Sequence, residues 1–160
     1  MSLIKRFFAR KPDTKFAPFT AELAPARLLY VVGDIHGCDD LLKCLIEKID
    51  KDASDRPHDL VFVGDYVDRG EASASVITRL HALSRQDHVT CLMGNHERML
   101  LDFLDDPVKN GRHWFSNGGL QTLASFGVGG VTETASPEVM VKARDTFERK
   151  LGPLKYWLSN

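Results

Sequence analysis

Three stretches of the sequence decide the fold: residues 28–37 read LLYVVGDIHG, residues 60–70 read LVFVGDYVDRG, and residues 89–97 read VTCLMGNHE. Each stretch begins with a continuous apolar run and then reaches a glycine, at Gly33, Gly64 or Gly94. Runs rich in Val and Leu that do not alternate with polar residues are typical of strands buried on both faces, as in a parallel sheet. The sequence therefore predicts three parallel strands.

Helical patterns lie between these runs. Apolar residues repeat at the i, i+3, i+4 spacing of an amphipathic helix in two segments: Leu41, Leu42, Leu45, Ile46 and Ile49, and then Val76, Ile77, Leu80 and Leu83. The three glycines are about 30 residues apart, which is the length of one βαβ unit. We expect the first hundred residues to fold as β-α-β-α-β-α within an α/β domain.

The rest of the chain reads as mostly helical. A third helix should follow Gly94 and end near Asp106-Pro107, and residues 111–119 look like a loop. Residues 120–126 suggest a short helix. A last helix should begin after Ser136, have Met140, Ala143, Phe147 and Leu151 as its buried stripe, and stop at Gly152-Pro153.

The overall composition is that of a single globular domain without a nucleic-acid partner. The 160 residues carry 21 Lys and Arg against 22 Asp and Glu, so the chain has no basic footprint for DNA or RNA. No apolar run approaches the roughly 20 residues of a membrane span. The three cysteines lack C-x-x-C spacing, which favours a reducing cytoplasm. We expect residues 1–26 to be a basic arm and lead-in, followed by one domain over residues 27–160.

Polar residues stand where each predicted strand ends. Asp34 and His36 follow the first strand, Asp65 the second and Asn95 the third. Taken singly, Asp34 or Asn95 could cap a helix, and His36 could be a turn residue. The carboxyl ends of parallel strands meet at one edge of a sheet, and helix capping does not require these residue types at all three ends. Carboxylate, imidazole and amide ligands together favour a divalent metal pair.

These motifs carry a family resemblance. GDIHG, GDYVDRG and GNHE resemble the signature of the metallophosphoesterases, and GDYVDRG is similar to that of the serine/threonine phosphoprotein phosphatases, including their small bacterial members. The likeness covers residues 28–98, and residues 114–127 (WFSNGGLQTLASFG) also resemble the bacterial members. It implies a calcineurin-like αββα sandwich, of which this chain would hold the N-terminal β-α-β-α-β half.

The resemblance also implies residue roles. Asp34 and His36 would hold the first metal, Asp65 would bridge both metals, and Asn95 would bind the second. His96 would be the general acid and Asp68 would orient it. Arg69, with Asn95 and His96, would bind the substrate phosphate. Each role suits its group, because a metal pair needs a shared anion, a leaving alkoxide needs a proton, and a guanidinium matches two phosphate oxygens.

The expected reaction is phosphomonoester hydrolysis, with a water activated between two divalent metal ions attacking phosphorus directly. Manganese is the expected metal, with iron and zinc as alternatives, and a phosphorylated protein or small phosphoester is the expected substrate. Symmetrical dinucleoside tetraphosphate hydrolysis is a rival within the superfamily, but Asp68 and Glu97 favour the phosphatase branch. A non-catalytic metal-binding module is the rival outside the enzymes.

The resemblance further implies two histidine ligands beyond residue 160. His113 is the only histidine after His96, and it does not follow an apolar strand. We therefore expect this chain to be incomplete for activity, with the inner face of its sheet exposed and a tendency to associate.

Two interpretations stay open for four residues between positions 112 and 117. Arg112, His113, Trp114 and Asn117 could line a substrate rim or form a loop around one buried indole. For Cys38, we expect a packed thiol rather than a reactive one.

Overall fold

The sheet contains three parallel strands, as the sequence predicts. The structure is a computed structural model that describes residues 27–160, so the expected basic arm lies outside the described residues. Strands β1 (Leu28–Val32), β2 (His58–Phe62) and β3 (Val89–Cys91) lie side by side in that order, with Val31 opposite Val61 and Val61 opposite Thr90. The order follows from two successive βαβ units.

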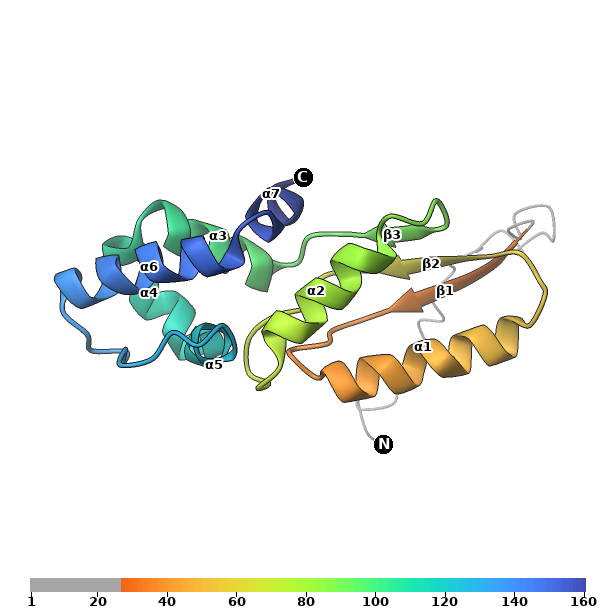
Figure 1. The fold of residues 1–160 in the computed structure, drawn as a ribbon, viewed down its shortest axis with the longest axis horizontal. Coiled ribbons are helices and arrows are strands. Elements are labelled where there is room, and N and C mark those ends of the chain that lie inside the picture. The colour runs from red at the N-terminus through yellow and green to blue at the C-terminus, as the bar shows by residue number, and fades with distance from the viewer. Residues whose placement is uncertain (1–26) are drawn as a thin grey trace, which may run out of the picture.

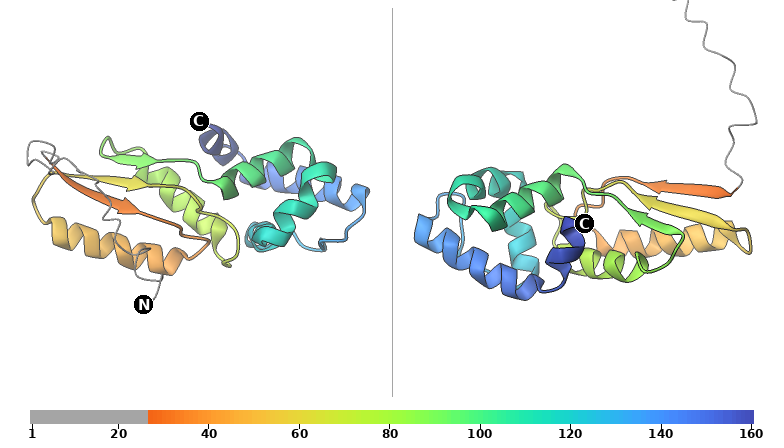
Figure 2. Two further views of the ribbon diagram at one scale, coloured as in Figure 1. Left: turned by 180° about the vertical axis from the view of Figure 1, so that it is seen from behind. Right: turned by 90° about the horizontal axis from the view of Figure 1, so that it is seen from above.

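Helices α1 (Asp39–Ala53) and α2 (Ser73–Leu83) connect the strands and cover the same face of the sheet (Figures 1 and 2). They bury Leu42 and Ile49 from α1, and Val76, Ile77 and Leu80 from α2. The predicted alternation of strand and helix is therefore confirmed. The apolar stripe of α1 is narrower than predicted, because Leu41 and Leu45 are exposed.

The other face of the sheet is open in the described part of the chain. Leu29 and Val31 point to this face and are 52% and 59% exposed, while Leu60 and Phe62 on the helical face are buried. Both connecting helices lie on one side, so within residues 27–160 the strands are not buried on both faces as their apolar runs suggest. The expectation from the family resemblance that the inner face of the sheet is exposed is confirmed for these residues.

Strand β3 leads into a helical half that lies beside the sheet half (Figure 1). Its elements are α3 (Asn95–Asp105), α4 (Pro107–Trp114), the π-helical turn η3 (Phe115–Gly119), α5 (Leu120–Ser125), α6 (Pro137–Leu151) and α7 (Leu154–Ser159). Three predicted helices are confirmed as α3, α5 and α6, and α6 buries the expected stripe and ends before Gly152, which has a φ of 53°.

Residues 111–119 are helical apart from a kink at Gly118, which has a φ of 106°, so the prediction of a loop over the whole segment is wrong. Asp106 caps α4 by accepting the backbone N–H of Lys109, and Pro107 takes the first helical position. Trp114 and Phe115 are buried against Phe103. Burial of these two rings outweighs the turn tendency of the glycines in this segment.

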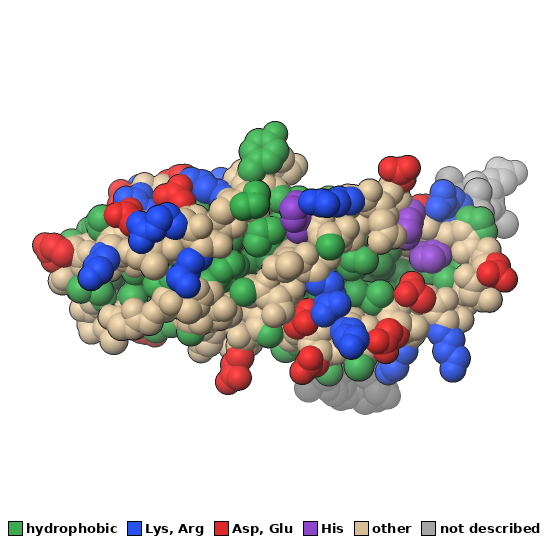
Figure 3. Space-filling view, in the orientation of Figure 1, with side chains coloured by type: hydrophobic (Ala, Val, Ile, Leu, Met, Phe, Trp, Pro, Cys, Tyr) green, Lys and Arg blue, Asp and Glu red, His purple; other side chains and the backbone are tan. Residues whose placement is uncertain are grey.

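The surface in Figure 3 shows hydrophobic side chains between the charged groups, including the area where the two halves meet. None of the helices that the structure describes is long and apolar enough to cross a membrane. Cys38 is exposed just before α1, with its Sγ 3.6 Å from the carbonyl oxygen of His36, so the expected packed thiol is wrong.

Candidate metal-dependent active site

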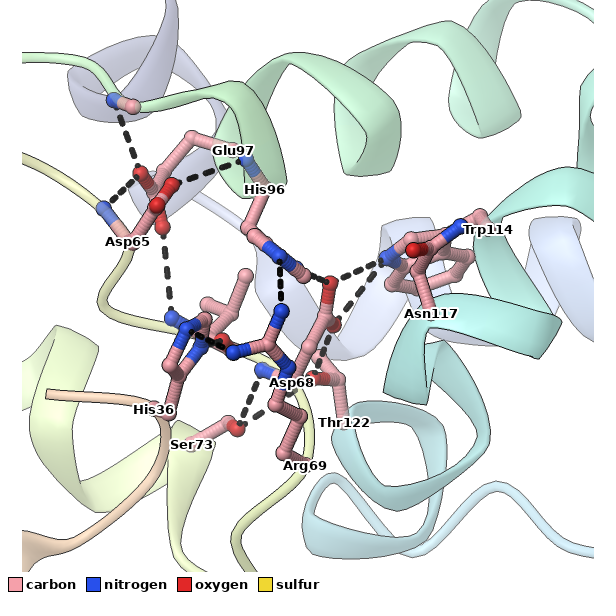
Figure 4. Close-up of polar contacts among 12 residues, drawn as sticks. His36, Asp65, Asp68, Arg69, Ser73, His96, Glu97, Trp114, Asn117 and Thr122 are labelled. Atoms are coloured by element: carbon pink, nitrogen blue, oxygen red, sulfur yellow. Dashed lines mark hydrogen bonds and ion pairs between the residues drawn. The ribbon is translucent and has the colours of Figure 1, made fainter. Parts of the chain in front are cut away.

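Three loops meet at the junction of the sheet half and the helical half. His36 follows β1, Asp65 follows β2, and His96 lies in the first turn of α3 (Figure 4). One potential ligand atom from each of these three residues lies within 4.8 Å of the others. The fold therefore gathers a carboxylate and two imidazoles from three separate motifs.

The backbone of these loops adopts an unusual conformation. His36, Asp65, Asp68 and Arg69 all have positive φ angles, between 44° and 74°. Non-glycine residues rarely adopt this region, and such residues often cluster at functional sites. The backbone N–H groups of Ile35 and His36 both donate to the carbonyl oxygen of Asp65, each at 3.0 Å. The strained loops therefore stabilise each other.

Gly94 permits a close approach between two of the loops. A Cβ atom at Gly94 would lie 2.2 Å from the Asp65 Oδ1 atom and 2.4 Å from the Asp65 backbone nitrogen. In the structure, Asp65 Oδ1 instead accepts the backbone N–H of His96 at 3.0 Å. The glycine of the third motif thus allows the second and third motifs to share one hydrogen bond.

Glu97 fastens the loop after β2 to the start of α3. Its buried carboxylate accepts the backbone N–H groups of Asp65, Tyr66 and Gly94 at 2.8 to 2.9 Å, and that of Val67 at 3.2 Å. Burial raises the pKa of Glu97, and the four N–H donors oppose that rise. Glu97 also lies in the first turn of α3, where the helix dipole favours a carboxylate.

Replacing Glu97 with Gln is expected to lower the free energy of unfolding by about 2 to 4 kcal/mol, because an amide offers one acceptor oxygen and turns an N–H₂ group toward backbone donors. Urea unfolding of the variant and the parent measures this loss. Glu138→Gln is a matched control, since Glu138 also lies in the first turn of a helix but is exposed. Equal midpoints for Glu97→Gln and Glu138→Gln would contradict the fastening role.

The two histidines present different nitrogen atoms to the site. His36 Nδ1 lies 2.8 Å from the carbonyl oxygen of Val67 and donates to it, which leaves Nε2 as the nitrogen with a lone pair. His96 Nδ1 lies 2.7 Å from Asp68 Oδ2, so its Nε2 is on the opposite side of the ring, toward Arg69. A second ring nitrogen fixed in this way is typical of metal-binding and proton-transferring histidines.

Arg69 lies across both imidazoles. Its Nη1 is 2.8 Å from His36 Nε2 and its Nη2 is 3.2 Å from His96 Nε2. The side chain is exposed and Figure 4 shows it directed between the two rings. An anion bound to the Arg69 guanidinium would therefore lie beside His96 as well.

The other predicted ligands lie at the margin of this group. Asp34 is exposed, and its Oδ2 lies 3.6 Å from His36 Nε2. Asn95 is also exposed and is the first residue of α3, next to His96. His96, for which we expected an acid role, places a ring nitrogen within the candidate metal group itself.

Asp68 is completely buried behind His96. Burial raises the pKa of Asp68, and hydrogen bonds from Thr122, His96 and Trp114 oppose that rise. Thr122 was missed by the sequence reasoning. For the four residues that could line a substrate rim or surround one indole, the structure shows that Trp114 is the buried indole and that Arg112 and His113 are exposed. Asn117 lines a cavity of about 480 Å³ that reaches Arg69.

The chemistry of the gathered groups fits a bound metal. Asp65 supplies an anionic oxygen and His36 supplies an imidazole lone pair, which are the ligand types that borderline divalent metals accept. Their position beyond the carboxyl ends of parallel strands is also where α/β folds bind ligands. This combination is typical of the class of metal-dependent sites.

Family comparison agrees with that class. Residues 28–152 match the calcineurin-like phosphoesterase family, Metallophos, and the chain belongs to this family. Its members use a dinuclear metal centre. The expected family and α/β fold class are thereby confirmed.

Two kinds of curated relative match part of the chain. The symmetrical bis(5'-nucleosyl)-tetraphosphatase of Pseudomonas fluorescens is 42% identical over 73 residues, which cover 45% of this chain and 24% of that protein. Serine/threonine-protein phosphatase 1 of Salmonella typhimurium is 38% identical over 96 residues, which cover 56% of this chain and 41% of that protein. The chain thus matches less than half the length of either relative.

Proposed function

We propose that the protein is a metal-dependent phosphomonoesterase of the serine/threonine protein phosphatase type, acting in the cytoplasm. The observation that carries this proposal is the pair formed by His96 and Asp68, whose imidazole presents Nε2 beside His36 and Asp65. A serine alkoxide is a poor leaving group, so a positioned proton donor is what its departure requires.

His36 and Asp65 would hold the metal pair together with Asp34 and Asn95, and Asp65 would be the shared ligand. When bound, two divalent ions polarise phosphoryl oxygens and activate water. Manganese is the proposed metal, with iron and zinc as alternatives, because all three accept carboxylate and imidazole ligands.

The remaining groups act on the substrate. Arg69 would grip two oxygens of the phosphate, and Asn95 would assist it. Once Arg69 has turned from His96 Nε2 to the phosphate, His96 protonated on both ring nitrogens would hold the phosphate and then transfer its Nε2 proton to the leaving oxygen, ending as a neutral imidazole. Asp68 keeps Nδ1 protonated during that transfer, because it accepts the Nδ1–H and is acceptor-only when ionised.

The cavity beside Arg69 favours a peptide over a dinucleotide. Asn117, Gln121 and Glu133 line it together with Arg69. The carboxylate of Glu133 would repel further phosphates of a polyphosphate chain, whereas amides can hydrogen-bond a peptide. Symmetrical dinucleoside tetraphosphate hydrolysis is the second candidate, and the more identical relatives favour it.

A substrate panel separates these functions. We expect the protein loaded with Mn²⁺ to have a kcat/KM for phosphoserine peptides at least tenfold above that for a dinucleoside tetraphosphate. The ratio is the measurement, because we expect a low absolute turnover from this chain. A preference for the dinucleotide would establish the second candidate instead. Metal binding without turnover of either substrate would identify a non-catalytic module.

A further inference from the structure

The carboxylate of Asp68 has hydrogen-bond donors on both oxygens. His96 Nδ1 lies 2.7 Å from Oδ2, and the indole Nε1 of Trp114 lies 3.0 Å from Oδ1 and 2.9 Å from Oδ2. The hydroxyl of Thr122 donates to Oδ1 at 2.7 Å. All four residues are at most 2% exposed, so water does not compete for these bonds.

Trp114 offers its N–H from a rigid position. Its ring is fully buried, with the rings of Phe103, Phe115 and Phe147 at centroid distances of 4.8, 5.9 and 5.8 Å. Close packing on this side leaves the indole no alternative orientation without a cavity. The N–H therefore fixes the plane of the Asp68 carboxylate from the helical half of the molecule.

Thr122 holds both the backbone and the side chain of Asp68. Its Oγ1 accepts the backbone N–H of Asp68 at 2.9 Å while its O–H donates to Asp68 Oδ1. Ser73 Oγ also lies 3.2 Å from the same backbone nitrogen. Asp68 has a φ of 74°, so these contacts hold a backbone conformation that an aspartate rarely adopts.

Two glycines between Trp114 and Thr122 allow this segment to pack closely against Arg69 and the indole of Trp114. A Cβ atom at Gly118 would lie 2.5 Å from the backbone nitrogen of Arg69, and one at Gly119 would lie 2.4 Å from the indole Cδ2 of Trp114. Figure 4 shows Trp114 and Thr122 approaching Asp68 from the helical half, opposite the strand-end loops. The segment is thus shaped around Asp68 and its neighbour.

We infer that Trp114 and Thr122 are positioning residues for the proton donor: they orient the carboxylate of Asp68, which in turn aims His96 Nε2 at the leaving oxygen. This inference rests on the proposed function for its kinetic consequence. A carboxylate that lost either donor could rotate away from His96 Nδ1. Both side chains are buried and neither lines the cavity beside Arg69, so they act on the proton donor through Asp68.

The first test is Trp114→Phe, which keeps an aromatic ring and removes the N–H. On a phosphoserine peptide, kcat should fall about 10- to 100-fold with KM within about twofold, the range for losing a group that orients an active-site ligand. On 4-nitrophenyl phosphate, whose leaving group needs no proton, the loss should be below about threefold. Equal losses on both substrates would show that Trp114 acts only through packing, which would contradict the inference.

A threonine series repeats the test without an aromatic substitution. Thr122→Val removes the hydroxyl at nearly constant shape and should show the same substrate-dependent loss, whereas Thr122→Ser keeps the hydroxyl and should restore at least half of the parent kcat. The matched control is Trp157→Phe, because Trp157 is the second tryptophan and stacks near Tyr66 instead. It should leave the ratio of the two kcat values unchanged.

A measurement without turnover separates this inference from the proposed function. The His96 Nδ1–H bonded to a buried carboxylate should give a far-downfield proton resonance in the parent, which Asp68→Asn should abolish. Trp114→Phe and Thr122→Val should shift or broaden this resonance, and Trp157→Phe should not. An unchanged resonance in both variants overturns the inference, even if the parent hydrolyses no substrate in the panel.

Discussion

Replacing Asp65 with Asn is expected to reduce the metal content of the protein and to lower its phosphatase turnover by roughly 10³-fold, which corresponds to about 4 kcal/mol of transition-state stabilisation. The substitution removes the negative charge that two cations would share. It should leave the fold intact, because an amide oxygen can still accept the His96 backbone N–H that Asp65 Oδ1 accepts. Metal analysis after identical Mn²⁺ loading, followed by a phosphopeptide assay, measures both effects.

Asp59→Asn is the matched control for this experiment. Asp59 lies on β2, the strand that leads to Asp65, but it pairs with Arg27 away from the site, at an Nη2 to Oδ1 distance of 3.2 Å. Metal content and turnover should stay at the parent level in this variant. If Asp65→Asn also retained both, the bridging role of Asp65 would be wrong.

The strands and their connecting helices were predictable because their signals are local. Each apolar run ends at a glycine, and the spacing between runs leaves room for one helix. What the pattern could not reveal is which face each helix covers. Leu29 and Val31 belong to a run typical of a strand buried on both faces, yet α1 and α2 leave their side of the sheet open in residues 27–160.

The prediction of a loop over residues 111–119 failed for a non-local reason. Asn117, Gly118 and Gly119 favour turns by composition. Apart from a kink at Gly118, the segment is helical because Trp114 is buried against Phe103 and donates to Asp68, which lies 46 positions earlier in the chain. Propensity is a weak guide wherever tertiary contacts of this kind compete with it.

The candidate site also contains some residues that could be predicted from the sequence and others that could not. The motif residues at the strand ends were predictable, since parallel strands bring their carboxyl ends together, and the structure gathers His36, Asp65 and His96 there. Their metal and catalytic roles stay predictions. Thr122 had no local signal, because its partner Asp68 is 54 positions away. Glu97 had a local signal, but its four backbone donors come from two different loops.

Replacing His96 with Asn should lower kcat on phosphoserine peptides by roughly 10²- to 10⁴-fold, the range expected when a general acid is removed. Asn cannot donate an acidic proton to the leaving oxygen, although its amide can still hydrogen-bond to Asp68. Turnover of 4-nitrophenyl phosphate should fall much less, because a phenolate departs without protonation. Steady-state kinetics on both substrates gives the ratio that identifies the acid.

His113→Asn is the control for the same substitution at an exposed histidine outside the gathered group, and it should change neither rate. One ring nitrogen of His96 also lies among the candidate metal-binding atoms, so metal content must be measured in His96→Asn as well. A parent-like metal content with a loss confined to the alkyl ester assigns His96 to proton transfer. Equal losses on both esters, with metal lost as well, would instead make His96 a metal ligand, and the proton donor would then have to be sought elsewhere.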